Sequence, residues 1–128
     1  MRALFAALVS LAALTTAAQA DTPSLPSNDC FFSSSWTGWS APGNGDALLL
    51  KINLHDIYRV DLVPGSHVRR LGDRFIVNHV RGSNTICSPL DLDLALVDHH
   101  GFHKPLIAQS LHKLSAEEIA AIPEHDRP

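Results

Sequence analysis

Apolar and polar residues alternate along much of this chain, and that alternation limits the fold more than any other feature. Every second residue from 48 to 54 is leucine or isoleucine, and Tyr58, Val60 and Leu62 continue the pattern after a turn expected at His55-Asp56. Successive side chains of a strand point to opposite faces of its sheet. We therefore expect a β-hairpin with one face in the core and the other in water.

Three more segments carry strand patterns. Residues 74–80 are rich in β-branched and aromatic side chains, residues 90–96 place leucine at every second position, and residues 106–111 form a last short run. A helix would scatter the leucines of residues 90–96 around its surface, so their period favours a strand. The chain is predicted to be mainly β: a small antiparallel barrel or sandwich of five to six strands.

The C-terminal part of the chain has the pattern of a helix start. Ser115 followed three residues later by Glu118 is a capping box, in which each side chain accepts a hydrogen bond from the other residue's backbone N–H. A short C-terminal helix is predicted over Ala116–Ala121, ended before Pro123. Residues 123–128 are mostly polar, and we expect them to be a frayed tail.

The N-terminal residues resemble a cleavable signal peptide, residues 1–20. Arg2 gives a positive start, Ala3–Leu14 is a short apolar core, and Ala18-Gln19-Ala20 is a pattern that signal peptidase accepts. The apolar run is shorter than the roughly 20 residues of a membrane span, so no integral membrane segment is expected after cleavage. We expect a periplasmic or secreted protein, with residues 21–29 as a flexible leader.

Charge argues against nucleic acid as a partner. The chain has ten Lys and Arg and 13 Asp and Glu, a net charge of −3. Removal of residues 1–20, which hold one arginine, leaves nine basic against 13 acidic residues, a charge of −4. A mildly acidic domain is poorly suited to phosphate backbones or anionic lipid. The basic residues Arg69, Arg70, Arg74 and Arg81 are interpreted as a solvated loop.

The two cysteines, Cys30 and Cys87, both follow the predicted cleavage point. Two cysteines in an oxidising compartment most often pair, and the chain-entropy model assigns such a long loop about 4 kcal/mol. We therefore expect one disulfide that closes a single β domain over residues 30–122. Two free buried thiols are the alternative.

Five short motifs occur in an order that resembles a known family: Cys30-Phe31, Trp36, Tyr58–Leu62, Ile86–Asp91 and Leu111–Glu118. Together they resemble the small exported bacterial proteins of the domain-of-unknown-function family numbered 6491, over about residues 30–122. That family has no assigned activity, so the resemblance implies compartment and fold and leaves function open.

Members of that family often carry two further cysteines, near the positions of Ser66-His67 and Leu106-Ile107 in this sequence. This chain has neither, which implies that a second bridge is missing. Apolar residues such as Val68 or Ile107 are expected to fill its place.

Histidines are the main candidates for a site, because the chain has eight. His99, His100 and His103 surround a glycine turn, and imidazoles are good ligands for zinc or copper. Asp98 could add an oxygen ligand or orient an imidazole. The alternative is a solvated hairpin tip. The histidines interpreted as ordinary surface residues are His55, His67, His79 and His112.

No catalytic motif is present in the sequence. A nucleophile elbow, a phosphate loop and a dinucleotide fingerprint are all missing. Asp91 and Asp93 share one parity and could act as paired acids, but solvated alternation explains them equally well. Among the aromatic residues, Phe31 and Trp36 are expected in the core. Trp39, beside a Pro-Gly loop, is the candidate for contact with a ligand.

These observations predict a non-catalytic exported module of the cell envelope that binds an unknown envelope protein or a small ligand, or serves a structural role. The alternative is a periplasmic zinc or copper protein that uses His99, His100 and His103. No other cofactor is expected.

Overall fold

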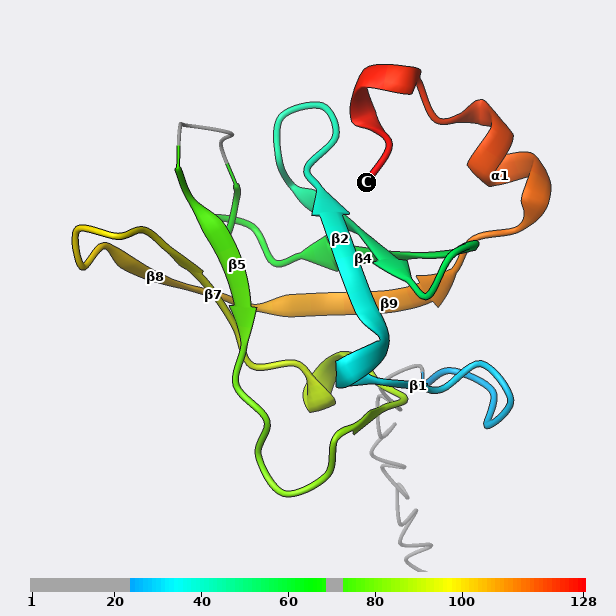
Figure 1. Ribbon diagram of the computed structural model, residues 1–128, viewed down its shortest axis with the longest axis horizontal. Coiled ribbons are helices and arrows are strands. Elements are labelled where there is room, and N and C mark those ends of the chain that lie inside the picture. Colours follow the sequence, from blue (N-terminus) through cyan, green and yellow to red (C-terminus); the bar gives the residue numbers. More distant parts are fainter. Residues whose placement is uncertain (1–23, 69–72) are drawn as a thin grey trace, which may run out of the picture.

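The computed structural model describes residues 24–68 and 73–128 (Figure 1). The predicted signal peptide, the first residues of the leader, and Arg69 and Arg70 lie outside the described residues. The strands are β1 (Phe31–Phe32), β2 (Trp36–Ser40), β3 (Ala47–Ile52), β4 (Asp56–Leu62), β5 (Phe75–Asn78), β6 (Thr85–Ile86), β7 (Leu94–Val97), β8 (His103–Leu106) and β9 (Ala108–Lys113). The helices are η1 (Ser33–Ser35), η2 (Pro89–Asp91), α1 (Ala116–Ala121) and η3 (Glu124–Asp126), where η marks a 3-10 turn.

The described strands form three antiparallel sheets. Their strand orders are β1-β6, β2-β3-β4-β9 and β5-β7-β8. A mainly β fold with one short α-helix near the C-terminus is therefore confirmed. Over the described ranges the sheets do not close into a barrel, and the two larger sheets share one core, as in a sandwich.

The main core lies between the inner face of the four-stranded sheet and the three-stranded sheet. Alternate residues of β3, β4 and β9 meet residues of β7 and β8 in this core. Its members include Leu48, Leu50, Ile52, Tyr58, Val60, Leu62, Leu94, Leu96, Leu106 and Leu111. The period-two pattern therefore identified most of the residues that hold the two sheets together.

The β3–β4 hairpin forms as predicted, but its turn lies earlier in the chain. Asn53 has a left-handed φ of 54°, which asparagine tolerates better than most residues. The turn consequently occupies residues 53–55, and the side chain of Leu54 is 76% exposed. The expectation that Leu54 extends the strand was wrong, because the chain has already reversed there.

The outer face of the β3–β4 hairpin is not wet, in contrast to the prediction. Leu49 is only 2% exposed, and it packs with Ile57 and Leu114 in a second apolar cluster. Ile119 of α1 and Ile122, just after the helix, complete this cluster. The C-terminal helix therefore covers the sheet face that alternation alone assigned to solvent.

Residues 89–91 form the 3-10 turn η2, so the predicted strand over residues 90–96 is wrong in its first half. The carboxylate of Asp91 accepts hydrogen bonds from the backbone N–H groups of Cys87 (2.9 Å) and Ser88 (2.8 Å). Pro89 stands at the start of the turn, where its fixed φ suits a helical turn. Leu90 is 79% exposed as a result, and β7 begins only at Leu94.

The predicted last strand divides at Ile107, because the chain passes there from one large sheet to the other. Ile107 N donates to Ser66 Oγ at 3.3 Å, and Ile107 O accepts from Val63 N at 3.0 Å. Ser66 and Ile107 are thus neighbours. They stand near the positions at which members of the resembled family often carry two further cysteines, which this chain lacks. Val68 is buried in the main core, whereas the side chain of Ile107 is exposed.

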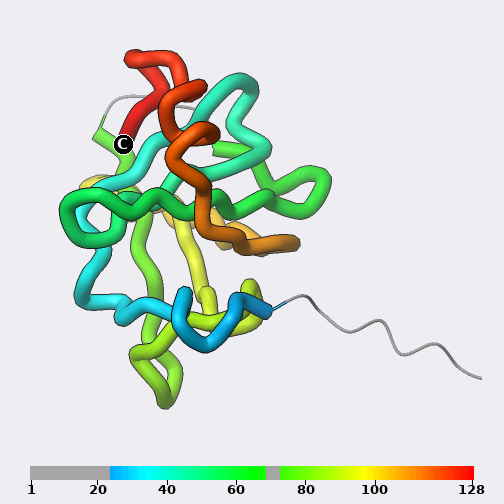
Figure 2. The backbone as a smooth tube through the Cα atoms, turned by 90° about the vertical axis from the view of Figure 1, so that its right-hand side faces the viewer, coloured from blue at the N-terminus to red at the C-terminus, as the bar shows by residue number. Residues whose placement is uncertain are grey.

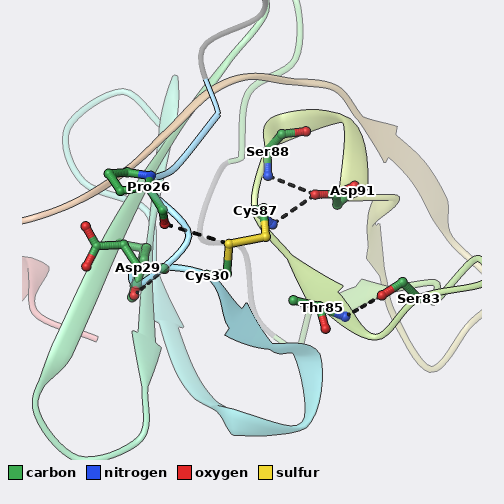
Figure 3. Close-up of a disulfide and its surroundings, with 9 residues drawn as sticks. Pro26, Asp29, Cys30, Ser83, Thr85, Cys87, Ser88 and Asp91 are labelled. Carbon is green, nitrogen blue, oxygen red and sulfur yellow. Dashed lines mark hydrogen bonds between the residues drawn. A yellow bond between two sulfur atoms is a disulfide. The ribbon is translucent and has the colours of Figure 1, made fainter.

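Cys30 and Cys87 form the predicted disulfide (Figure 3). The bridge lies directly beside the short β1–β6 ladder, in which Phe31 pairs with Ile86. Leu25, predicted to lie in a flexible leader, is instead buried, and its N–H donates to the carbonyl of Cys87 at 2.6 Å. The described part of the leader is therefore attached to the domain.

The helix α1 has the predicted bounds and the predicted capping box. Glu118 N donates to Ser115 Oγ at 3.2 Å, and Ser115 N donates to Glu118 Oε2 at 2.7 Å. The tail differs from the prediction, since residues 124–126 form η3 and the hydroxyl of Ser40 donates to the carbonyl of Asp126. That hydrogen bond holds the tail against β2 in place of a frayed end.

Candidate binding site

A cavity of about 460 Å³ lies between α1 and the outer face of the four-stranded sheet. Its volume is within the range of small-molecule sites. Figures 1 and 2 show α1 and the C-terminal turn at one end of the molecule, with β1 at the opposite end. The cavity is lined by the apolar residues Pro42, Leu49, Leu114, Ala121, Ile122 and Pro123 and by the polar residues Arg59, His112 and Glu118.

One row of side chains crosses the four strands and contributes to this cavity. In the strand register Ser40 pairs with Leu49, Leu49 with Arg59, and Arg59 with His112. Directly paired residues project from the same face of a sheet. The outer face therefore changes from an apolar side chain on β3 to a guanidinium on β4 and an imidazole on β9, and three members of the row line the cavity.

Arg59 is fixed by a carboxylate on its own strand. Arg59 Nε donates to Asp61 Oδ1 at 2.7 Å, and Ser110 Oγ donates to Asp61 Oδ2 at 2.6 Å. Partial burial would raise the pKa of Asp61, but these hydrogen bonds and the charge of Arg59 outweigh it and hold that pKa below its usual value. Among the described residues, neither Nη atom of Arg59 has a hydrogen-bond acceptor.

Glu118 is engaged in the structure of the helix. The backbone hydrogen bond from Ser115 lowers the pKa of the Glu118 carboxyl, and the positive charge of protonated His112 lowers it further. The same charge also lowers the pKa of Asp61. His112 therefore acts electrostatically on both carboxylates at the polar end of the cavity.

The predicted histidine site lies elsewhere, on the hairpin between β7 and β8. His99 and His100 are exposed at its tip, and His103 begins β8. Asp98 Oδ1 accepts hydrogen bonds from the backbone N–H groups of His100 (2.8 Å) and Phe102 (2.9 Å). The Asp98 carboxylate thus shapes the turn, and it is not used to orient an imidazole.

The three imidazoles of this hairpin have different neighbours. The ring of His99 lies 5.3 Å from that of Phe75, whereas the ring of His103 lies 6.2 Å from that of His79. Over residues 24–68 and 73–128, no three potential ligands are grouped as a metal would need. Zinc or copper binding by His99, His100 and His103 stays a prediction that this arrangement does not favour.

Trp39 is half-buried and packs against the main core. It pairs with Leu50, whose side chain belongs to the inner face of the sheet, so Trp39 lies on the face opposite to the cavity. The indole of Trp36 donates to Gly38 O at 2.8 Å. Contact of Trp39 with a ligand stays a prediction. The position of Trp39 on the opposite face of the sheet does not support contact with a ligand in the cavity.

The residues of the cavity were missed because His112 was interpreted as an ordinary surface residue and Arg59 as part of a wet face. A signal was present in the sequence: Leu49 and Ile57 are apolar at positions that alternation assigns to water. Two such residues on paired strands indicate that something covers that face. The one helix that the sequence predicts, Ala116–Ala121, is the element that covers it, although it lies far from both residues in the chain.

Within the described part of the chain, no helix is both long and apolar enough to cross a membrane. Comparison of the chain with protein-family models, with curated proteins and with solved structures found no match. Membership in the family that the five motifs resemble therefore stays a prediction.

Proposed function

We propose that this protein is an exported, non-catalytic binding module of the cell envelope that holds a small ligand between its four-stranded sheet and α1. The observation that carries the proposal is the cavity itself. Apolar side chains form most of its lining, and Arg59 presents to it hydrogen-bond donors that no described residue engages. Ligand sites typically combine an apolar lining with a few such polar groups.

Two features support export. Residues 1–20 have the pattern of a signal peptide. The Cys30–Cys87 disulfide is of a kind that persists in oxidising compartments such as the periplasm. Mass spectrometry of protein from its native compartment, alkylated without reduction, tests this part of the proposal. We expect the mass of residues 21–128 with no alkyl adduct; an uncleaved chain or two adducts would contradict export.

The cavity lining supports binding in preference to catalysis. Its acidic residue, Glu118, accepts a structural hydrogen bond and has a lowered pKa, which does not suit a general acid. Among the residues that the structure describes, the lining contains no serine, threonine, cysteine or lysine that could act as a nucleophile. Turnover of an envelope substrate by the purified mature protein would overturn this conclusion.

Two tryptophan variants of α1 test whether the cavity is the binding site. Ala121 lines the cavity, whereas its neighbour Ala120 does not, and both are exposed. Ala121→Trp is expected to abolish the methyl NMR shifts that ligands induce at Leu49 and Ile122 in a screen of small envelope metabolites. Ala120→Trp should leave those shifts unchanged. A screen in which no compound shifts either methyl group of the unmodified protein would reject the proposal.

A further inference from the structure

We infer that the ligand of this cavity is an amphipathic acid, with a carboxylate held by Arg59 and His112 and a short apolar chain against Leu49 and Ile122. This inference rests on the proposed function, because it specifies the chemistry of a ligand in the same cavity. It follows from three observations: the order of the side chains across the sheet, the hydrogen bonds of Arg59, and the hydrogen bonds already accepted by the neighbouring carboxylates of Asp61 and Glu118.

The order of side chains places the two halves of such a ligand next to each other. Leu49, Arg59 and His112 are paired in sequence across β3, β4 and β9. Neighbouring strands lie about 4.8 Å apart, so the backbone positions of Leu49 and Arg59 are separated by about one strand spacing, as are those of Arg59 and His112. A carboxylate and a carbon several bonds along its extended alkyl chain have a similar separation.

The bonding of Arg59 leaves the correct donors for a carboxylate. Its Nε is occupied by Asp61, which fixes the plane of the guanidinium, and its two Nη atoms have no acceptor among the described residues. The side chain is 43% exposed, so a ligand from solution can reach it. A planar guanidinium binds a carboxylate with two parallel hydrogen bonds, which a neutral hydroxyl cannot reproduce.

The nearby acidic residues determine which charge a ligand can carry. Both carboxylate oxygens of Asp61 already accept a hydrogen bond, and Glu118 accepts one from the backbone of Ser115. An amine would compete with existing donors at Asp61 and at Glu118 Oε2, which leaves it a single oxygen, Glu118 Oε1. An acid meets the two Nη atoms of Arg59, which lie in one plane and have no acceptor among the described residues. The two carboxylates still repel an acid, and the positive charge of Arg59 opposes that repulsion, as His112 does whenever it is protonated.

Octanoate, octan-1-ol and octylamine test the inference on the mature, disulfide-bonded protein, because they differ only in the head group. Binding is measured as NMR shifts of the Leu49 and Ile122 methyl groups during titration. We expect octanoate to bind about tenfold more tightly than octan-1-ol, the effect of one charge-assisted hydrogen bond. Octylamine should bind more weakly than either.

Two variants assign the preference to individual charges. Arg59→Gln should weaken octanoate binding about tenfold and octan-1-ol binding much less, because the alcohol loses no charge-assisted pair of hydrogen bonds. Glu118→Gln keeps a capping-box residue while it removes a negative charge, so octanoate should bind several-fold more tightly, with a smaller change for the uncharged octan-1-ol. Arg59→Lys should restore only part of the octanoate affinity, because an ammonium lacks the planar pair of donors.

The possible results separate this inference from the proposal on which it rests. Equal binding of octanoate and octan-1-ol, or tighter binding of octylamine, overturns the acid preference and leaves a ligand cavity in place. No methyl shift with these three compounds or with the wider screen rejects both. The ratio of octanoate to octan-1-ol affinity in the unmodified protein tests the acid preference even where a variant does not fold.

Discussion

At the scale of single residues, Asp61 connects the site to stability. It accepts hydrogen bonds from Arg59 and Ser110, and its pKa is lowered on balance. A carboxyl group whose pKa is lower in the folded state stabilises that state above its unfolded pKa of about 3.9. The contribution disappears as the pH falls through the folded pKa.

Asp61→Asn should therefore weaken the pH dependence of stability in the acid range. We expect the variant to lose about 1 kcal/mol near neutral pH, a small value because the pair is partly exposed to solvent. At a pH below the folded pKa of Asp61 the two proteins should converge. Urea unfolding between pH 2 and pH 7 measures the difference, and parallel curves over that whole range would contradict the assignment.

Two glycines in the loop between β2 and β3 provide a second comparison. Gly43 and Gly45 both have a left-handed φ, 60° and 83°. A Cβ at Gly45 would lie 1.9 Å from Val68 O, whereas one at Gly43 would have no neighbour within 4 Å. Gly43→Ala should cost about 1–2 kcal/mol from the backbone alone. Gly45→Ala should cost about 3 kcal/mol or more in urea unfolding, and equal losses would show that Val68 can move.

At the scale of elements, the sequence predicted the strands and the helix in which the spacing of apolar residues and the local hydrogen bonds favour the same structure. Alternation in β4 and the capping box of α1 each have one interpretation, and both were confirmed. Residues 90–94 alternate equally well, but Ser88, Pro89 and Asp91 form a local turn that replaces the first part of the strand. Local hydrogen bonds of this kind are invisible to a test of periodicity.

The cavity was not predictable in the same way. It depends on α1 folding back over the outer face of β3 and β4, a contact between residues 49 and 122 that no local pattern encodes. Leu49 and Ile57 indicated only that this face is covered. The second apolar cluster identifies α1 as the covering element, and the sheet register shows the pairing of Arg59 with His112.

The two aspartates of the Leu-Asp-Leu-Asp segment should therefore behave differently. Asp91 accepts two backbone hydrogen bonds at the start of η2, whereas Asp93 pairs with the exposed side chain of Arg81. Asp91→Ala should cost about 1 kcal/mol, as expected for loss of a cap. Asp93→Ala should cost less than about 0.5 kcal/mol. Similar losses for both in urea unfolding would favour an alternating strand.

At the scale of the whole molecule, the disulfide joins the residue before β1 to the residue after β6. The bridge spans 57 positions of sequence, so it removes much of the freedom of the unfolded chain. Replacing both cysteines by serine should lower the free energy of unfolding by about 4 kcal/mol. The helix α1, whose residues help line the cavity, lies away from β1, which is next to the bridge (Figure 2). Octanoate affinity measured under conditions where the variant is folded should therefore be unchanged.

The helix α1 has six residues, far fewer than the roughly 12–15 that an isolated helix needs to persist in water. It is held by its capping box and by a small apolar cluster, so it should open locally while the sheets beneath stay folded. Its amide protons would then exchange with deuterated solvent faster than those of β3 and β4. A ligand bound between the helix and the sheet would slow that exchange. The exchange rate of the α1 amides would therefore report, without any label, whether the cavity is occupied.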